Sequence, residues 1–278
     1  MNFYEFVRTA LEEDIKEGDH STLACIAADK QGKAILKIKE TGIIAGVDIA
    51  QQIFSYIEPE CTLSIFKKDG EKVNAGEIAF EVNATVHTIL KAERLVLNVM
   101  QRMSGIATLT NQYVEKIKDY PAKILDTRKT TPNFRWFEKQ AVVIGGGQNH
   151  RFGLYDMVML KDNHIDYCGG IENAIDKTHA YLKEKNLTLK IEVEARSIDD
   201  VKRIMAHGGV DRIMLDNFTP ETIVEALQII GKKYETEASG GITLDTITDF
   251  AKTGVDFISA GAIIHHAVSM DLSLKALM

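Results

Sequence analysis

The sequence predicts an α/β protein, in which an incomplete parallel α/β barrel of about six strands follows a smaller N-terminal α/β sandwich domain. Two observations predict this fold. After Pro121, short apolar runs alternate regularly with helical segments, and before residue 87 short alternating runs are separated by turn signals. Alternating strands and helices imply parallel strands with right-handed crossovers. We expect an N-terminal domain with its connecting helix at 1–108 and a catalytic barrel at 109–278, with a C-terminal tail that can return to the N-terminal domain.

The N-terminal half is expected to open with an amphipathic helix at 3–16, where apolar residues follow helical spacing. Residues 33–86 then alternate between apolar and polar groups, with turn signals such as Asp69-Gly70, and predict mostly strands. Within it, residues 69–86 also resemble the hairpin of lipoyl and biotinyl carrier modules, with Lys72 at the turn. Plain scaffold is the preferred interpretation.

A long helix is predicted at 87–118, with a break at Ser104-Gly105. Beyond it, strands are predicted at six apolar runs. They are Lys123–Leu125, Met157–Leu160, Leu189–Val193, Arg212–Leu215, Tyr234–Ala238 and Phe257–Ser259. A Rossmann-type sheet is the alternative, but no GxGxxG follows the first strand and polar groups follow every strand. A barrel gathers such strand ends on one rim.

Composition narrows the class of protein. The chain has 278 residues, 45% of them hydrophobic, which is enough for a substantial core. A net charge of −7 without a basic stripe disfavours nucleic acid as a partner. The three cysteines form no CxxC pair, which disfavours a disulfide framework and a structural zinc site. No apolar leader and no run of membrane-spanning length is found. We therefore expect a cytoplasmic protein that binds no membrane.

The expected rim carries groups that suit a substrate with several negative charges. Arg128 and Arg151 can each bind a carboxylate or phosphate with two parallel hydrogen bonds, whereas Lys129 and Lys161 act as compact charges. Glycine-containing turns follow the last two strands, where βα barrels often hold a phosphate on backbone N–H groups. These turns are Ser239-Gly240-Gly241 and Ala260-Gly261-Ala262.

Two carboxylates, Glu194 and Asp216, end the middle strands and could grip ribose hydroxyls or, through water, a divalent cation such as Mg²⁺. Glu192 is expected to point the opposite way from Glu194. Other groups are interpreted as structural. His87, His179 and His207 are expected to lie in or beside helices as structural residues, and Phe134 and Trp136 are expected to pack rather than to stack on bases.

At this point the residues resemble a known family, the decarboxylating nicotinate-nucleotide pyrophosphorylases, also called quinolinate phosphoribosyltransferases. The resemblance covers essentially the whole chain and rests on motifs in a fixed order. They are Glu93-Arg94 with Leu97-Asn98, Ser104–Thr108, Asp126–Thr130, Gly145–Gly147 with Asn149–Arg151, Lys161–His164, Glu192–Glu194, Leu215–Asn217, Ser239–Gly241 and Gly261-Ala262.

The resemblance implies a pentosyltransferase of pyridine nucleotide and NAD biosynthesis. It would join quinolinate to phosphoribosyl pyrophosphate, giving nicotinate mononucleotide, pyrophosphate and carbon dioxide, with Mg²⁺ and no organic cofactor. The implied catalytic residues are Arg128, Lys161, Glu194 and Asp216. The implied substrate-binding residues add Thr127, Lys129, His150, Arg151, Ser239, Gly240, Gly241, Ala260, Gly261, Ala262 and His265, with Arg94 reaching in from a neighbouring subunit. A homodimer would then be the minimal unit, and a hexamer is a further possibility.

Three positions depart from the family's pattern. Val143 stands where a basic residue is expected, Gln140 where an aromatic one is common, and Ile264 where a small hydroxyl residue precedes His265. These departures affect the expected local contacts and substrate affinity. A molybdenum-associated group shares the fold and an Arg-Lys-Thr signature, but the intact Asn149–Arg151 segment argues against it.

Two further alternatives stay open from the residues alone. A barrel lyase or aldolase could use Lys161 for a Schiff base, which would require a desolvated lysine with a lowered pKa. A non-enzymatic binding module could use residues 33–86, and would be indifferent to mutation of Arg128.

Overall fold

The computed structural model describes residues 2–277, and the chain divides into two compact units. The first unit comprises Met1–Asn111, Thr131–Gly146 and His266–Met278, and the second comprises Gln112–Thr130 and Gly147–His265. Each unit has its own sheet. Among the described residues, no helix combines the length and the apolar character that crossing a membrane requires.

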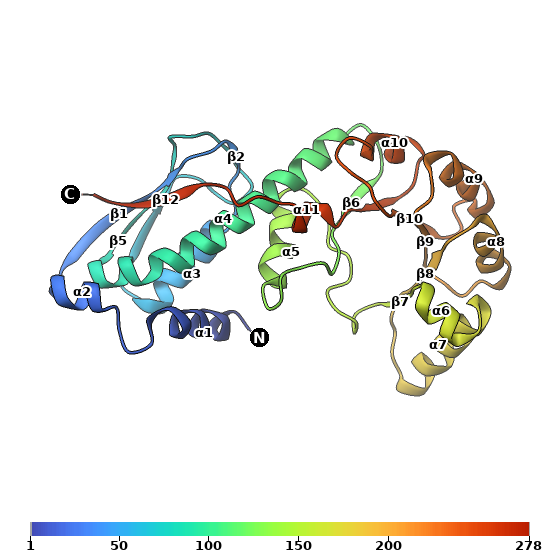
Figure 1. Ribbon diagram of the computed structural model, residues 1–278, viewed down its shortest axis with the longest axis horizontal. Coiled ribbons are helices and arrows are strands. Elements are labelled where there is room, and N and C mark those ends of the chain that lie inside the picture. The colour runs from blue at the N-terminus through green and yellow to red at the C-terminus, as the bar shows by residue number, and fades with distance from the viewer. Residues whose placement is uncertain (1, 278) are drawn as a thin grey trace. The chain divides into compact units, whose positions relative to one another are not determined.

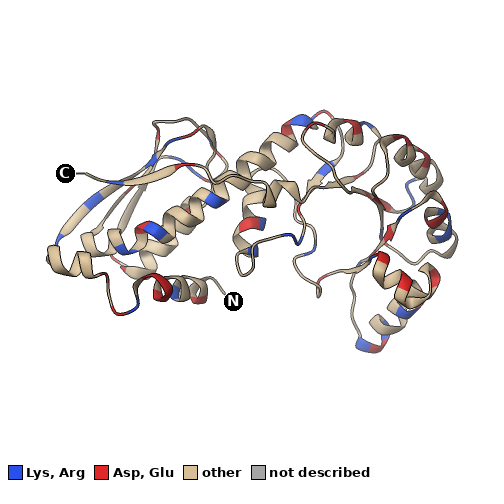
Figure 2. Ribbon diagram, viewed as in Figure 1, with Lys and Arg blue, Asp and Glu red and all other residues tan. Residues whose placement is uncertain are grey.

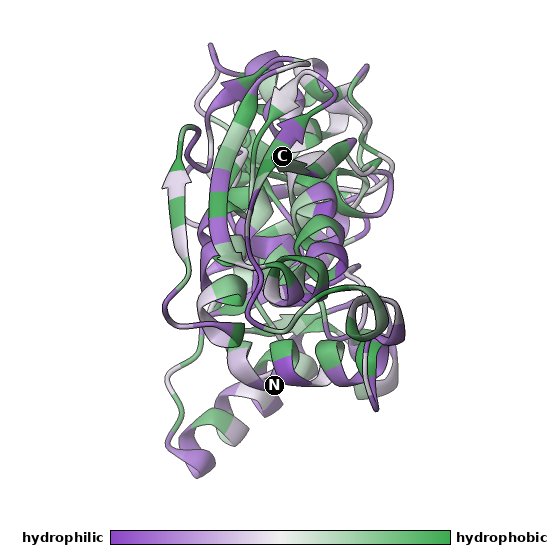
Figure 3. Ribbon diagram, turned by 90° about the vertical axis from the view of Figure 1, so that its left-hand side faces the viewer, coloured by the Kyte–Doolittle hydropathy of each residue, from purple (hydrophilic) through white to green (hydrophobic). Residues whose placement is uncertain are grey.

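The sheet of the first unit has four antiparallel strands in the order β12-β1-β5-β3. They are β1 (Gln31–Ile38), β3 (Thr62–Ile65), β5 (Ile78–Thr85) and β12 (Leu272–Leu277). Along these strands hydropathy alternates, as Figure 3 shows, because successive side chains point to opposite faces. The C-terminal strand β12 pairs with β1 in register, from Lys33 opposite Leu277 to Ile38 opposite Leu272. A short ladder of β2 (Gly42–Ile43) and β4 (Lys72–Val73) lies in the same unit.

A helix, α3 (Val47–Ile57), interrupts the segment that was expected to be mostly strands. It begins after Gly46, whose φ of 94° is in the left-handed region that glycine adopts readily. The carboxylate of Asp69 accepts the backbone N–H of Val47 at 2.8 Å, so a distant residue caps the helix. A cap from 22 positions along the chain leaves no local sequence signal.

The long helix α4 (Val86–Lys116) runs through Ser104 and Gly105, so the predicted break is wrong. Ser104 is fully buried, and its hydroxyl accepts the N–H of Ala45 at 2.9 Å and donates to the carbonyl of Ala45 at 3.1 Å. A Cβ on Gly105 would lie 2.0 Å from the carbonyl oxygen of Val268. These two small residues therefore allow other segments to approach an unbroken helix.

The opening helix α1 (Phe3–Ile15) confirms the amphipathic helix predicted at 3–16. It packs against α5 (Arg135–Ile144) through aromatic rings, with 4.5 Å between the centroids of Phe6 and Phe137. The rings of Phe134 and Phe137 stack at 4.6 Å, and Trp136 meets Phe137 edge-on at 4.9 Å. Phe134 and Trp136 thus pack, as predicted. A further short helix, α2 (His20–Cys25), follows α1.

The second unit is a six-stranded parallel sheet in the order β6-β11-β10-β9-β8-β7. The strands are β6 (Lys123–Leu125), β7 (Val158–Leu160), β8 (Ile191–Ala195), β9 (Arg212–Asp216), β10 (Glu235–Ser239) and β11 (Phe257–Ser259). They confirm all six predicted strands to within a few residues. Since β7 to β11 are neighbours in chain order, the sheet is wound in one direction, as in a βα barrel.

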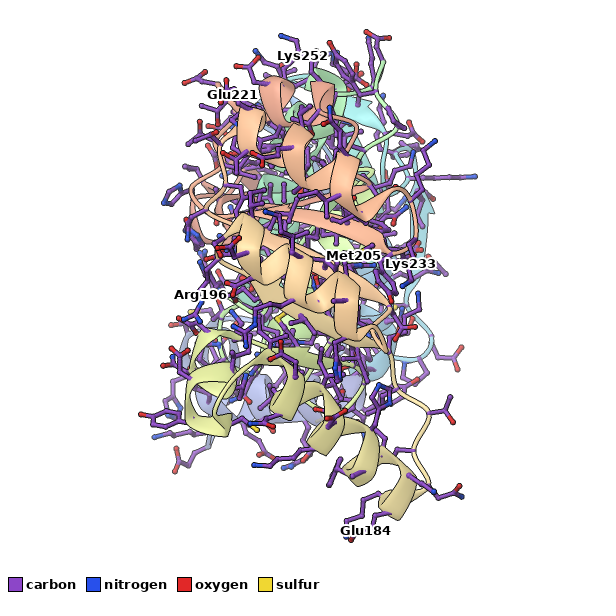
Figure 4. The ribbon with its side chains drawn as sticks, turned by 90° about the vertical axis from the view of Figure 1, so that its right-hand side faces the viewer. Glu184, Arg196, Met205, Glu221, Lys233 and Lys252 are labelled. Carbon is purple, nitrogen blue, oxygen red and sulfur yellow. The ribbon has the colours of Figure 1, made fainter. Side chains whose placement is uncertain are left out.

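Helices cover the outer face of this curved sheet (Figure 1), and Figure 4 shows them from outside, with Glu184, Met205 and Glu221 on that helical layer. The helices of this unit are α6 (Asp162–Cys168), α7 (Ile171–Lys185), α8 (Ile198–His207), α9 (Pro220–Ile230) and α10 (Ile247–Lys252); the short helix α11 (Ala262–His265) follows β11 and is not part of the outer layer. The barrel is incomplete, as predicted: β6 and β7 are the two edges of the sheet. Among the described residues, an isolated bridge between Leu125 and Gln148 is the only pairing beyond β6.

The three histidines predicted to be structural have partners in the fold. The Nε2 atom of His87 lies 3.0 Å from the carbonyl of Ile26, and that of His179 lies 2.7 Å from the carbonyl of Gly209. His207 pairs with Asp176 at 3.0 Å on the outer helices. All three cysteines are free thiols.

Candidate active site

Every predicted site residue except Arg94 belongs to the second unit, where it lies in the last residues of a strand or in a segment that connects the strands. We call the carboxyl ends of the six parallel strands the rim. Parallel strands bring these ends to one edge of the sheet, which is where barrel active sites lie. Arg94 is exposed on α4 in the first unit. Figure 2 shows acidic residues on the strands around β8–β10 and basic residues in the loop after β6.

Two arginines of the rim, Arg128 and Arg151, form no salt bridge with any other described residue. Arg128 follows β6 and is partly buried, and its Nε atom has no hydrogen-bond partner among residues 2–277. Burial lowers the pKa of Arg151, and the positive charge of Arg128 lowers it further. Within residues 2–277, the Arg151 guanidinium donates a hydrogen bond from Nη1 to the carbonyl of Met157, at 3.3 Å. Such a pair of cations is a ready binding site for an anion with two acidic groups.

Lys161, which follows β7, acts electrostatically on the carboxylates of two neighbouring strands, Glu194 and Asp216. Burial raises the pKa of Glu194, and the charge of Asp216 raises it further. Burial likewise raises the pKa of Asp216, whereas the positive charges of Lys161 and Lys129 oppose that rise. Asp162, the first residue of α6, adds a third negative charge that raises the pKa of both groups. This concentration of carboxylates favours a cation or a developing positive charge.

Glycine is required for different structural reasons in the two turns at the rim. Gly240 has a φ of +102°, and a Cβ there would lie 2.2 Å from the side-chain oxygen of Asn217. A Cβ on Gly261 would lie 3.0 Å from both the ring of His265 and the side chain of Lys129. The chain therefore brings the turn after β10 against β9, and the turn after β11 against the loop after β6.

Other predicted residues of this region have defined places. Ser239 ends β10, and its carbonyl accepts the backbone N–H of Asn217 at 2.8 Å. Thr127 Oγ1 accepts the N–H of Lys129 at 3.1 Å. Ala260 is buried and donates its N–H to the carbonyl of Leu125 at 3.1 Å. Gly241, with a φ of +60°, has open space where a Cβ would lie, and Ala262 begins α11. Asn217 itself, at a φ of 57°, was not predicted as a site residue.

Below the rim lies a buried charged cluster, which we define as His150, Glu192, Glu237 and Arg212. The Nε2 atom of His150 lies 3.0 Å from Glu192 Oε2 and 3.2 Å from Glu237 Oε2. Arg212 donates from Nη1 to Glu237 Oε2 at 3.1 Å. The side chains of both glutamates are fully buried, and 4% of the His150 side chain is exposed.

The charges in this cluster act on one another strongly. Burial lowers the pKa of His150, but hydrogen bonds and charges from Glu192 and Glu237 outweigh it and raise that pKa to about 9. Burial and the charge of Glu237 raise the pKa of Glu192 to about 7. On the other ring nitrogen, the N–H of Arg151 donates to Nδ1 at 2.6 Å. Because Nδ1 accepts this main-chain hydrogen bond, the bond opposes a proton on Nδ1, whereas the two carboxylates favour a doubly protonated ring. The neutral ring therefore carries its proton on Nε2, which faces the carboxylates.

The position of Glu192 corrects an expectation. It was predicted to point away from Glu194, but it lies inside the sheet with His150. Residues two apart on a strand share a face, so Glu192 and Glu194 must point to the same side. Arg212 and Glu237 were not predicted as parts of a site. Charged residues inside apolar strand runs are the signal that identifies them, because such groups are rarely buried without a partner.

The positions that depart from the family pattern lie in three environments. The side chain of Val143 is exposed on α5, Gln140 is partly buried one turn earlier, and Ile264 is fully buried in α11. Ile264 thus contributes to the core.

A cavity of about 920 Å³ opens at the other end of the same strands. Its lining includes Asp211, Tyr234 and Asp256, which precede or begin strands, and Lys233, which Figure 4 labels. The carboxylates are engaged by the fold: Asp211 accepts the N–H of Ile191 at 2.7 Å, and Asp256 accepts from Thr236. In barrels this end serves stability, so the rim remains the candidate active site.

Comparison with known proteins agrees with this geometry. Residues 19–104 match the family model of the quinolinate phosphoribosyl transferase N-terminal domain, and residues 106–275 match that of its C-terminal domain. The carboxylating nicotinate-nucleotide pyrophosphorylase of Arabidopsis thaliana, named as chloroplastic, is 43% identical over 97% of this chain and 81% of its own. A probable enzyme of that name from Bacillus subtilis is 41% identical over 94% of this chain and 89% of its own.

Solved structures show the same similarity. The crystal structure of NadC from Streptococcus pyogenes has a TM-score of 0.92 and 40% identity, and covers 99% of this chain and 96% of that one. The nicotinate-nucleotide pyrophosphorylase of Francisella tularensis has a TM-score of 0.91 at 40% identity, over 99% and 96% of the two chains. With both domain models matched in order and relatives of this identity aligned over nearly its whole length, the chain belongs to the quinolinate phosphoribosyltransferase family.

Proposed function

We propose that this protein transfers a phosphoribosyl group from phosphoribosyl pyrophosphate to quinolinate and decarboxylates the product, giving nicotinate mononucleotide, pyrophosphate and carbon dioxide for NAD biosynthesis. The observation that carries the proposal is a pair of rim arginines, Arg128 and Arg151, that act on each other electrostatically and form no salt bridge within residues 2–277. Quinolinate offers two adjacent carboxylates on a rigid ring. A planar guanidinium can bind each of them with two hydrogen bonds.

In this proposal Arg128, Arg151 and Lys161 bind the quinolinate carboxylates, and His150 lies behind them. Arg94 would complete the pocket from a neighbouring subunit, which makes a homodimer the minimal active unit, and a hexamer would be an assembly of such dimers. Lys161 also interacts with Glu194 and Asp216, so it would connect the acid pocket to the sugar site.

Phosphoribosyl pyrophosphate would lie across the two glycine turns. Gly240 and Gly241 after β10, and Gly261 after β11, offer backbone N–H groups without a side chain in the way. Ser239, Ala260 and Ala262 flank these turns. Lys129 and His265, which meet at Gly261, add positive charge, and Thr127 fixes the loop that carries Lys129.

The residues present fit Mg²⁺. Glu194 and Asp216 each have a pKa raised by burial and by nearby carboxylates, and a divalent cation would relieve that repulsion directly or through water. When bound, the metal supplies charge that neutralises the departing pyrophosphate. No organic cofactor is needed for this chemistry.

The chain's own charges explain the order of bond changes. As the bond from the ribose carbon to pyrophosphate breaks, positive charge grows on the sugar, and Glu194 and Asp216 stabilise it. The pyridine nitrogen bonds to that carbon and becomes a pyridinium. The carboxylate on the adjacent ring carbon then leaves as carbon dioxide, because the electron pair left behind is next to the positive nitrogen, and that carbon takes up a proton. Arg128 and Arg151 hold the acid in place throughout.

The cytoplasm is the proposed compartment, since free thiols at all three cysteines suit a reducing environment.

The proposal is tested by incubating the purified protein with quinolinate, phosphoribosyl pyrophosphate and Mg²⁺, and by measuring nicotinate mononucleotide and pyrophosphate. Equal amounts of both products are expected, and a folded protein that forms neither would refute the proposal. Sharing of the site is tested by mixing inactive Arg94→Ala and Lys161→Ala proteins. Partial recovery of activity is expected, because a mixed dimer retains one site with both residues intact. No recovery despite proven subunit exchange would refute the role of Arg94 across subunits.

A further inference from the structure

The buried charged cluster is costly to the fold and is not explained by substrate binding alone. Two carboxylates and a guanidinium lie within the sheet on β8, β9 and β10, where apolar side chains would fill the space. Replacing buried ion pairs with packed apolar residues is often neutral or stabilising. Retaining such a cluster directly beneath an active site therefore points to a role in the site.

The cluster holds His150 from several sides. Its Nε2 atom lies between Glu192 Oε2 and Glu237 Oε2, at 3.0 and 3.2 Å. Its backbone N–H donates to Asp126 Oδ1 at 2.8 Å, and Asp126 is itself fully buried. Its Nδ1 atom accepts the backbone N–H of Arg151 at 2.6 Å. The ring thus links two strands of the sheet to the main chain that carries Arg151.

We propose, on the basis of the function proposed above, that Glu192 and Glu237 are positioning residues for the quinolinate pocket. They fix the His150 imidazole, and the imidazole fixes the backbone of Arg151, so that the Arg151 guanidinium is held beside Arg128. Glu192 has a second effect, because its negative charge reaches Arg151 and offsets part of the repulsion from Arg128.

Arg212 supports this arrangement from below. It donates to Glu237 at 3.1 Å and, at the outer end of the strand, to Glu235 from Nε at 3.3 Å and from Nη2 at 3.1 Å. Its guanidinium also lies 4.1 Å from the centre of the Phe257 ring, where a cation is stabilised by the ring face. The Oε2 atom of Glu237 therefore contacts two groups that can donate a proton to it, Arg212 Nη1 and His150 Nε2.

A metal ion is the competing occupant of the cluster. Ligand atoms of His150, Glu192 and Glu237 lie within 4.8 Å of one another, which is a spacing a metal could use. Arg212 already donates to the same Glu237 oxygen that faces His150. A divalent cation there would compete with the guanidinium, whereas a proton on Nε2 is accommodated beside it.

The test compares Glu237→Gln and Glu192→Gln with the control Glu235→Gln, which removes the outer partner of Arg212 on the same strand. In each cluster variant we expect KM for quinolinate to rise by about tenfold or more, with KM for phosphoribosyl pyrophosphate within about twofold of wild type, since an uncharged amide weakens each contact to His150. The control should leave both KM values unchanged. Equal changes in both KM values, or none in an active enzyme, would overturn the proposal.

A second measurement needs no catalysis. The ¹⁵N signals of the His150 ring, assigned with His150→Gln, report its titration in the free protein, where Glu237, Glu192, Arg212, Asp126 and Arg151 surround it. Glu237→Gln should lower the titration midpoint by about one unit or more. An unchanged midpoint, or a stoichiometric metal in the purified protein whose removal perturbs these signals, would overturn the proposal. An inactive wild-type enzyme with the expected ring titration would refute only the proposed reaction.

Discussion

Replacing Arg128 with lysine separates charge from geometry at the proposed acid pocket. Lysine keeps the positive charge but loses the planar fork that binds a carboxylate at two points. The Nε atom of Arg128 is buried and without a hydrogen-bond partner in the described chain, so no other contact of that atom is lost. The substitution therefore tests whether the fork itself binds the substrate.

The expected magnitude follows from one lost hydrogen bond to a charged group. Such a bond contributes about 1.5 to 3 kcal/mol. Because about 1.4 kcal/mol corresponds to a factor of ten, Arg128→Lys should lower kcat/KM for quinolinate by about 10- to 150-fold. KM for phosphoribosyl pyrophosphate should stay within about twofold, since that substrate would bind at the glycine turns.

Steady-state kinetics with each substrate varied in turn measures this effect. Arg203→Lys is the matched control, because Arg203 on α8 forms the same kind of two-point pair with Glu172, at 2.9 and 2.6 Å, on exposed outer helices. That variant should retain normal kinetics. A loss below threefold for Arg128→Lys, or equal losses for both substrates, would refute the assignment of Arg128 to the quinolinate pocket.

Three other perturbations have definite expected outcomes. Gly240→Ala should reduce activity by about tenfold or more and raise KM for phosphoribosyl pyrophosphate. Gly241→Ala should lose less activity, because there is open space for the new methyl group. Equal losses of activity in kinetic assays of the two variants would contradict the steric argument. Arg102→Ala should lower the free energy of unfolding in urea by about 3 kcal/mol, because the buried Glu138 loses its 2.8 Å ion pair and keeps only the hydrogen bonds from Thr131. A change under about 1 kcal/mol would show that the Thr131 hydrogen bonds alone satisfy the carboxylate. Asp162→Asn should move the acidic limb of the pH–rate profile to lower pH, since it removes a charge that raises the pKa of both rim carboxylates, and an upward shift would contradict this sign.

Local patterns were enough to predict much of the fold. Each strand of the parallel sheet is a short apolar run between helical segments, and this signal does not depend on distant contacts. The helix α3 was missed because Asp69, far along the chain, caps its first turn. The break predicted at Ser104 and Gly105 was wrong because their small size serves contacts with Ala45 and Val268. Close approach between distant segments has no local signature.

The same distinction applies to the site. Residues at strand ends could be predicted because parallel strands place all such ends on one rim. The buried cluster was not predicted: Glu237, Arg212 and Glu192 interrupt apolar runs on neighbouring strands, but which of these charges pair with one another depends on contacts across the sheet. The face of the sheet to which Glu192 points follows from strand periodicity alone. The expectation that Glu192 and Glu194 point in opposite directions could therefore have been corrected from the sequence.

The pairing of β12 with β1 has a consequence for how the chain is made. The edge of β1 that β12 covers is synthesised early, and roughly 190 residues separate the end of β5 from the start of β12. At about 5 to 20 residues per second, that edge stays open for about 10 to 40 s on the ribosome. An uncovered strand edge can pair with other chains. The antiparallel sheet, whose first strands are translated before the parallel sheet, is thus completed after it. The open edge of β1 can pair with neighbouring nascent chains until the six residues of β12 have been synthesised.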